Sequence, residues 1–220
     1  MNPLDFVITR KRKKYRFALF REATNCYELD AWRSSKVSER LFAQQALTVE
    51  VGAGTGLFLV EVARRHPGKL YIALDVKADR LQKGAREALK LGLDNIWFVR
   101  ARADQLLEVV QPHSVQELWL TFSDPFPRRR DAKRRLTHAR YLEMYRKAHV
   151  DKNARINIKT DDQGLFHWTL EQLVATKWRL RELAFDLHNA PLSAEYKIMT
   201  TYERRWTTEG RTIYFVAASS

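Results

Sequence analysis

Three glycines behind a short apolar run are the first residues whose spacing suggests chemistry. Gly52, Gly54 and Gly56 follow the segment LTVEV, residues 47–51, which has the composition of a buried strand. Glycine permits a sharp turn and lets a ligand lie against bare backbone at the start of the next helix. The spacing G-x-G-x-G lacks the third glycine of a dinucleotide fingerprint and favours a nucleoside without pyrophosphate. A tight strand–helix turn that binds nothing is the alternative.

Two acids accompany this loop. Glu50 lies near the end of the same strand, and Asp75 closes the next apolar run, KLYIALD. An acid at that place can accept both hydroxyls of a ribose, although Asp75 could instead cap the following helix. Glu50 could face a cationic sulfonium or amino group, or could simply bond to amides of the loop. Because the loop has acids on either side and no lysine, S-adenosyl-L-methionine fits it better than a phosphate cofactor does.

A second cluster begins at Asp124, in the segment DPFPRRRDAKRR, residues 124–135. Its two prolines fix the backbone where a predicted strand ends. The carboxylate can accept hydrogen bonds from the amino and imino groups of a base, Phe126 can stack on a base, and the arginines can hold phosphates. The alternative, a charged face that is merely solvated, is less consistent with this position at a strand end.

Further polar residues follow other predicted strands. Asp161 comes directly after ARINIKT, residues 154–160, and Thr200 and Glu203 precede the last apolar run, TIYFVAA, residues 212–218. Taken separately, Asp161 would be a helix cap and Glu203 a surface charge. Their recurrence near strand ends makes a shared pocket a plausible hypothesis.

The elements that must position these residues alternate along the chain. The expected strands are 47–51, 69–75, 95–101, 115–122 and 154–160, and the expected helices are 57–65, 79–91, 136–150 and 164–177. The tail, residues 178–187 and 212–218, resembles two strands joined without a clear helix. This order predicts an α/β fold with a mostly parallel, doubly wound sheet and an antiparallel edge strand. Ligands are expected beyond the carboxyl ends of the strands.

Composition indicates the class of partner. The 220 residues include 39 Lys and Arg against 26 Asp and Glu, a net charge of +13. Such a surplus points to a polyanion, with nucleic acid as the default, and binding should weaken steeply with salt. We expect a basic N-terminal arm, residues 1–30, and one domain, residues 31–220. No membrane segment or secretory signal is expected, and the single Cys26 fits a cytoplasmic location. The scattered histidines predict no metal site.

Four segments together resemble one known family. The residues D-P-F-P-R-R-R-D-A-K-R-R-L, K-T-D and T-T-Y-E, with the glycine loop, are similar to the signature segments of the tRNA (guanine-7-)-methyltransferase family, in order over residues 48–218. The family's first segment reads D-P-W-P-K-K-R-H-x-K-R-R. The departures here include phenylalanine for tryptophan at Phe126, arginine for lysine at Arg128, and aspartate for histidine at Asp131. Arg102 stands where the family usually has Asp or Asn.

This resemblance implies a Rossmann-like class I methyltransferase fold and methylation of nitrogen 7 of a guanine in the tRNA variable loop. It implies cofactor contacts from the glycine loop, Asp75 and the segment Arg102, Ala103 and Asp104, in which Asp104 either substitutes at the adenine or the contact is lost. It implies that the guanine is held by Asp124, Arg128, Asp161, Thr200 and Glu203. We expect Asp124 to contribute most to catalysis.

Oligomeric state stays open between monomer and homodimer. Two other classes of protein stay open as well. One is a methyltransferase that acts on small molecules or proteins, because its glycine loop and Asp75 would look the same. The other is a non-catalytic RNA-binding protein with a decayed cofactor site, to which Arg102 lends some support.

Overall fold

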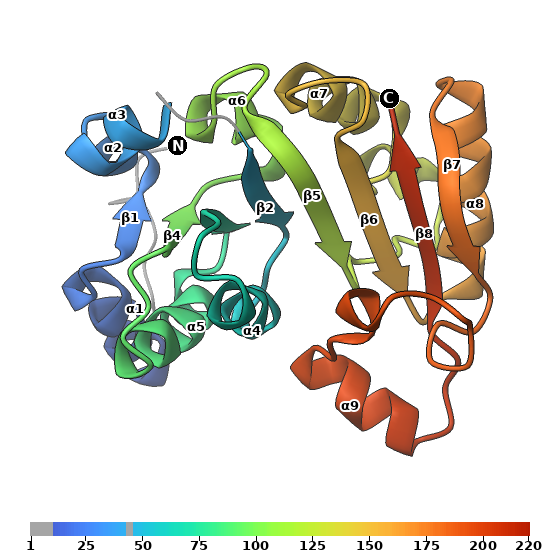
Figure 1. The fold of residues 1–220 in the computed structure, drawn as a ribbon. Coiled ribbons are helices and arrows are strands. Elements are labelled where there is room, and N and C mark those ends of the chain that lie inside the picture. Colours follow the sequence, from blue (N-terminus) through green and yellow to red (C-terminus); the bar gives the residue numbers. More distant parts are fainter. Residues whose placement is uncertain (1–10, 43–45) are drawn as a thin grey trace.

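One mixed sheet forms the centre of the protein in the computed structural model, which describes residues 11–42 and 46–220. Within these residues the sheet has eight strands in the order β1-β4-β3-β2-β5-β6-β8-β7 (Figure 1). The strands are β1 (Cys26–Glu28), β2 (Leu47–Val51), β3 (Tyr71–Asp75), β4 (Ile96–Arg100), β5 (Val115–Thr121), β6 (Arg155–Thr160), β7 (Arg179–Ala184) and β8 (Tyr214–Ser219).

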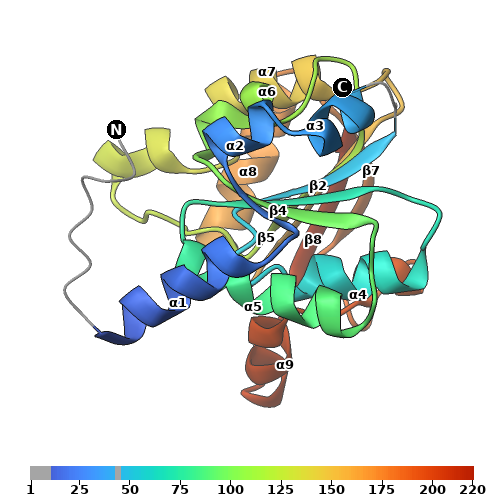
Figure 2. The same cartoon turned by 90° about the vertical axis from the view of Figure 1, so that its left-hand side faces the viewer.

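Helices cover both faces of this sheet. In Figure 2 one face carries α1, α4 and α5, and the opposite face carries α2, α3, α6, α7 and α8. The α-helices are α1 (Lys11–Glu22), α2 (Leu29–Arg33), α3 (Lys36–Phe42), α4 (Leu57–Arg65), α5 (Ala78–Lys90), α6 (Leu106–Val109), α7 (Ala139–Ala148), α8 (Gln163–Ala175) and α9 (Thr201–Thr208). The short 3₁₀ segments are η2 (Ala103–Gln105), η3 (Arg129–Arg134) and η4 (Ala194–Lys197). No helix among the described residues combines the length and the apolar character needed to cross a bilayer.

The central strands are buried on both faces, which explains their apolar sequences. Every residue of β2 and β3 is buried, as expected for parallel strands between two helical layers. The strands β1 to β6 pair in parallel, whereas β8 runs antiparallel to both β6 and β7. The predicted fold class is therefore confirmed. The reversed strand lies one place inside the edge, because β7 pairs along its outer side.

The strand order locates the binding edge. From β2 the sheet continues through β3 to β4 on one side, and from β5 it continues to β6 on the other. The chain therefore reverses its direction of winding between β2 and β5, which are paired directly. In such sheets a crevice opens beyond the carboxyl ends of the two strands at this switch point. The glycine loop follows β2, and the Asp124 segment follows β5.

The N-terminal residues that the structure describes are part of this fold. Helix α1 packs against α5, and β1 extends the sheet by pairing with β4. Phe20 of α1 is 1% exposed and belongs to the core on that face. Residues 11–28 are therefore folded onto the domain, although we expected them in a basic arm. The arm stays a prediction for residues 1–10, which lie outside the described residues.

The tail corrects one prediction. Strands β7 and β8 form as expected, but the expectation that no clear helix joins them is wrong, since η4 and α9 lie between them. Helix α9 begins with a capping box, in which Thr200 and Glu203 exchange side-chain and backbone hydrogen bonds. Its sequence, TYERRWTT, is eight residues long and has only two apolar residues, Tyr202 and Trp206, too few for periodicity to reveal a helix.

Candidate active site

The glycine loop turns sharply between β2 and α4. Gly52, Gly54 and Gly56 have φ values of +75°, +57° and +68°, which other residues adopt only with strain. Gly56 has a second constraint, because a Cβ there would lie 2.6 Å from Cε1 of Phe98. Gly52 and Gly54 line a cavity at the carboxyl ends of β2, β3 and β5, whereas Gly56 faces the core and acts by shaping the turn.

Asp75 holds this loop to the end of β3. Its Oδ2 accepts a hydrogen bond of 2.8 Å from the amide of Gly54, and its Oδ1 accepts one of 2.8 Å from the amide of Lys77. Burial raises the pKa of Asp75, and these two amides oppose that shift. The N-cap of α5 is Lys77, so Asp75 is not the cap of that helix. Both carboxylate oxygens retain lone pairs, and the side chain lines the cavity.

Glu50 places a buried carboxyl at the floor of the same cavity. It is fully buried and accepts a hydrogen bond of 2.5 Å at Oε1 from the hydroxyl of Thr121, at the end of β5. Oε2 has no hydrogen-bond partner among the described residues. Burial raises the pKa of Glu50 to about 8, although the bond from Thr121 opposes the rise. A buried carboxylate with an unused oxygen is costly unless a donor or a cation meets it.

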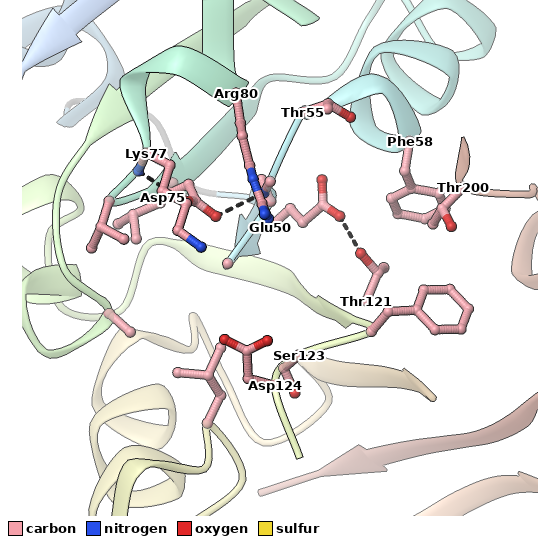
Figure 3. Close-up of a pocket in the computed structure, with 18 of the residues that line it drawn as sticks. Glu50, Thr55, Phe58, Asp75, Lys77, Arg80, Thr121, Ser123, Asp124 and Thr200 are labelled. Atoms are coloured by element: carbon pink, nitrogen blue, oxygen red, sulfur yellow. Dashed lines mark hydrogen bonds between the residues drawn. The ribbon is translucent and has the colours of Figure 1, made fainter. Parts of the chain in front are cut away.

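Asp124 reaches the cavity from the loop after β5. In Figure 3 the carboxyl groups of Glu50, Asp75 and Asp124 surround one open space, with Thr200 beside Phe58 at its rim. Two residues of this loop, Phe122 and Phe126, have positive φ values of 52° and 41°. For bulky side chains such values are strained, and strain of this kind is found mostly at functional sites.

Arginines of the basic run hold that loop. Arg135 donates from Nε to the carbonyl of Pro125 at 3.0 Å and from a terminal nitrogen to that of Phe126 at 3.1 Å. The guanidinium of Arg134 lies 4.4 Å from the centre of the Phe126 ring, and both side chains line the cavity. Part of the basic run is therefore structural. Arg128 is exposed at the start of η3 and does not line the cavity.

The segment after β4 places its charges away from the cavity. Ala103 lines the cavity, but Arg102 and Asp104 form an exposed ion pair with each other, 2.9 Å from Nε to Oδ1. Neither Arg102 nor Asp104 is among the residues that line the cavity. The two charges of the segment are satisfied by each other.

Asp161 and Glu203 are also engaged elsewhere. Asp161, after β6, forms an ion pair of 2.9 Å with Arg211, and Glu203 is completely buried behind Thr200. Of these late residues, only Thr200 lines the cavity. Of the site residues expected from sequence, the structure brings together Glu50, Gly52, Gly54, Asp75, Ala103, Asp124 and Thr200.

Several residues that line the cavity could not be identified from the sequence pattern around them. Thr121 lies at the end of β5, and its pairing with Glu50 joins residues 71 positions apart. Arg80 and Lys77 enter from the start of α5, and Phe58 enters from α4. The rule that strand ends converge could have identified Thr121. Arg80 and Phe58 belong to helices, and their direction depends on packing that periodicity does not specify.

Gly84 of α5 supports the glycine loop from behind. Its amide lies 2.9 Å from the carbonyl oxygen of Thr55, and a Cβ at Gly84 would clash with that oxygen. We expect Gly84→Ala to displace the loop, to lower stability by about 1–3 kcal/mol through overpacking, and to weaken ligand binding in the cavity. Thermal unfolding and cofactor titration measure both effects.

Gly68 provides the matched control, since no atom lies within 4 Å of a Cβ built there. Gly68→Ala should leave both quantities unchanged. A Gly84→Ala protein with unaltered stability and affinity would contradict the support assigned to this contact.

Comparison with known proteins connects this geometry to a reaction class. Residues 44–216 match a family model described as "Putative methyltransferase". A tRNA (guanine-N(7)-)-methyltransferase of Brevibacillus brevis is 36% identical over 181 residues, covering 82% of this chain and 84% of that protein. A protein of the same name from Cytophaga hutchinsonii is 37% identical over 171 residues, covering 76% of this chain and 77% of that protein.

Solved structures share the fold at lower identity. The 16S rRNA methyltransferase KamB superposes with a TM-score of 0.62 at 20% identity, covering 84% of this chain and 93% of that chain. The 16S rRNA (adenine(1408)-N(1))-methyltransferase of Catenulisporales acidiphilia superposes with a TM-score of 0.60 at 14% identity, covering 88% and 94%. At these identities the likeness shows the arrangement of the sheet and helices alone.

Proposed function

The chain belongs to the tRNA (guanine-N(7)-)-methyltransferase family, and from this premise we propose that it transfers a methyl group from S-adenosyl-L-methionine to nitrogen 7 of a guanine in the variable loop of tRNA. The observation that carries the proposal is the cavity at the switch point, where three features meet: the Glu50 carboxyl, whose Oε2 has no partner among the described residues, the Asp75 carboxylate at the end of β3, and the Asp124 loop. The net charge of +13 supports an RNA substrate. With tRNA as substrate, we also propose a cytoplasmic location.

The cofactor half of the cavity fits S-adenosylmethionine. Oε2 of Glu50 is buried, faces no donor among the described residues, and would be satisfied by the cofactor's cationic groups. Asp75 would accept the ribose hydroxyls with its remaining lone pairs. Gly52 and Gly54 would let the ligand lie against the backbone. Ala103 would border the adenine, while Arg102 and Asp104 satisfy each other.

The substrate half is assigned to residues across the cavity. Asp124 would accept from the amino and imino edge of guanine, and Phe126 offers a ring for stacking. Thr200 borders the same space. Arg128, exposed beside the cavity, would contact phosphate. Asp161 would join the guanine site if it exchanged its partner Arg211 for the base.

The reaction needs no general base. S-adenosylmethionine, when bound, supplies an electrophilic methyl group on a sulfonium. Nitrogen 7 of guanine already carries a lone pair and lies on the exposed major-groove edge of the base. The protein must therefore hold the base in line and exclude other orientations, and such positioning contributes up to about 7–11 kcal/mol.

Electrostatic stabilisation of the transition state is the second contribution to catalysis, after positioning. The purine gains positive charge as it is alkylated, and Asp124 at the cavity rim can stabilise that charge while it bonds to the amino edge. Variable-loop guanines are often paired in the tRNA core, so the base must be turned out at a cost of about a few kcal/mol. Contacts between the basic run at residues 128–135 and the tRNA backbone would offset that cost.

Two transcripts test the proposed position. We expect label from methyl-labelled S-adenosylmethionine to enter a tRNA transcript that has guanine in its variable loop. A transcript that differs only by adenine at that place should remain unlabelled, because adenine presents a different edge to Asp124. Label of equal intensity in both would mean that methylation occurs elsewhere in the RNA. No label in either would leave a binding protein as the better description.

A further inference from the structure

Lys159, at the carboxyl end of β6, is a buried cation beside the candidate active site. Its side chain is 0% exposed. Nζ donates a hydrogen bond of 2.7 Å to the carbonyl oxygen of Ile198 and lies 3.3 Å from each carboxylate oxygen of Glu203. Burial lowers the pKa of Lys159, and the neighbouring Glu203 opposes that shift. Long cationic side chains are almost never fully buried unless they are paired, so Glu203 is the partner that permits this position.

Glu203 connects this cation to the start of α9. Its Oε2 accepts a hydrogen bond of 3.0 Å from the amide of Thr200, and its own amide donates one of 2.9 Å to Oγ1 of Thr200. Its Oε1 also lies 3.0 Å from Nε2 of His188. Both oxygens of Glu203 are therefore engaged, and Thr200 stands between Glu203 and the cavity. Glu203, expected from sequence to bind guanine, contacts the cavity only through Thr200.

The ammonium group also lies near the other wall of the cavity. Nζ of Lys159 is 5.3 Å from the centre of the Phe58 ring on α4, and Phe58 lines the cavity beside Thr200 (Figure 3). From a single place on β6, Lys159 thus lies against Glu203 in the first turn of α9, the preceding Ile198 and the Phe58 ring at the rim of the cavity. Loss of the ammonium would leave the Glu203 carboxylate buried without its cation, a strongly unfavourable state. Opening of the first turn of α9, which would admit water to Glu203, would relieve that state.

We propose that Lys159 is a positioning residue, which through Glu203 fixes Thr200 and the first turn of α9 against the substrate half of the cavity. The inference rests on the proposed function for its consequence in catalysis. It assigns roles to Lys159 and to the carboxylate of Glu203 that do not require either side chain to touch the guanine.

A double-mutant cycle tests this role. Lys159→Met removes the charge at similar length, and Glu203→Gln removes the opposite charge while a glutamine can still form the capping box. In the double variant no buried charge lacks a partner. We expect Lys159→Met to lower kcat by about 30-fold, the double variant to recover most of that loss, and the coupling to lie well outside additivity. The Kd for S-adenosylmethionine should change much less than kcat, because β2 and β3 carry those contacts and the charge of Lys159 is the smallest of the named influences on the pKa of Glu50.

Lys152→Met, on the exposed turn before β6, is the matched control and should have wild-type kcat. Full activity in Lys159→Met would overturn the proposal, and so would a double variant whose losses simply add. Amide hydrogen exchange over residues 200–208 tests the positioning of Thr200 separately from the proposed methyl transfer. If the wild type transfers no methyl group, the proposed function fails. Faster exchange in Lys159→Met that the double variant reverses would still support the positioning of Thr200, and unchanged exchange would overturn it.

Discussion

Asp124→Ala should lower kcat for tRNA by about 100- to 1,000-fold, the range found when one group that stabilises developing charge is removed. The side chain lines the cavity from the loop after β5, opposite the cofactor half. It is exposed rather than part of the core, so its removal leaves no buried charge without a partner. The affinity for S-adenosylmethionine should therefore be nearly unchanged. Single-turnover kinetics and cofactor titration separate the two quantities.

The control for this experiment removes an exposed acid from the other end of the sheet. Asp94 precedes β4 and does not line the cavity, so Asp94→Ala should retain wild-type kcat and affinity. Asp124→Asn separates the effect of the charge from that of the hydrogen bond, because asparagine retains an acceptor oxygen and loses the charge. If Asp124→Ala reduced cofactor affinity as much as turnover, Asp124 would belong to the cofactor half and its assignment would be wrong.

Glu50→Gln should weaken binding of S-adenosylmethionine by about 10- to 100-fold at pH 8, the range for loss of a charge-assisted hydrogen bond. Glutamine keeps an acceptor for the hydroxyl of Thr121 and nearly the same volume, so the loss reports the charge. Calorimetric titration measures it. Glu117→Gln is the matched control, because Glu117 is another poorly exposed carboxyl with a raised pKa on β5, bonded to Asn157 and outside the cavity. Its substitution should not alter cofactor affinity.

The raised pKa of Glu50 predicts that the affinity for S-adenosylmethionine depends on pH. Burial raises the pKa of Glu50 from its ordinary 4.5 to about 8, so below pH 8 the ligand-free site holds a neutral carboxyl. A cationic ligand favours the ionised form, and affinity should therefore rise with pH, by at most about tenfold per unit, until about pH 8. Glu50→Gln, measured in the same buffers so that titration of the ligand cancels, should lack this rise. An identical pH profile in both proteins would show that Glu50 does not meet the cation.

The stability of the ligand-free protein should fall as pH rises, which is opposite to the change in ligand affinity. A carboxyl whose pKa is higher in the folded than in the unfolded state stabilises the fold fully below the unfolded value. For Glu50 that contribution is lost as pH rises from 4.5 through about 8. Thermal unfolding of the ligand-free wild type should therefore show a steeper decline over this range than Glu50→Gln, in which only the other poorly exposed carboxyls with raised pKa values, Asp75 and Glu117, still contribute.

Much of the site was predictable because strand ends converge. Gly52, Gly54 and Asp124 follow predicted strands and Asp75 ends one, and the parallel order of the sheet brings them to one edge. Glu50 was predictable as an acid near the cofactor, although not its bond to Thr121, which depends on the register between β2 and β5.

The rest depended on contacts that local patterns do not contain. Lys159 and Glu203 are 44 positions apart, so no local pattern could show that the carboxylate of Glu203, which the family resemblance assigns to the guanine, is paired with a buried cation. Arg102 and Asp104 are close in sequence, yet only the side-chain directions reveal that they pair with each other outside the cavity. Helix α9 is short, has few apolar residues and is fixed by its cap and by Glu203, so periodicity missed it.

The identity of the methylated atom is the central claim, and one substitution in the substrate tests it. Purified protein is incubated with methyl-labelled S-adenosylmethionine and two tRNA transcripts, which carry guanine or 7-deazaguanine at the variable-loop site. The deaza base keeps the amino and imino edge offered to Asp124 and lacks only the nucleophilic nitrogen. We predict label in the first transcript and none in the second. Equal label in both would contradict the account, because the methyl group would then be attached to another atom.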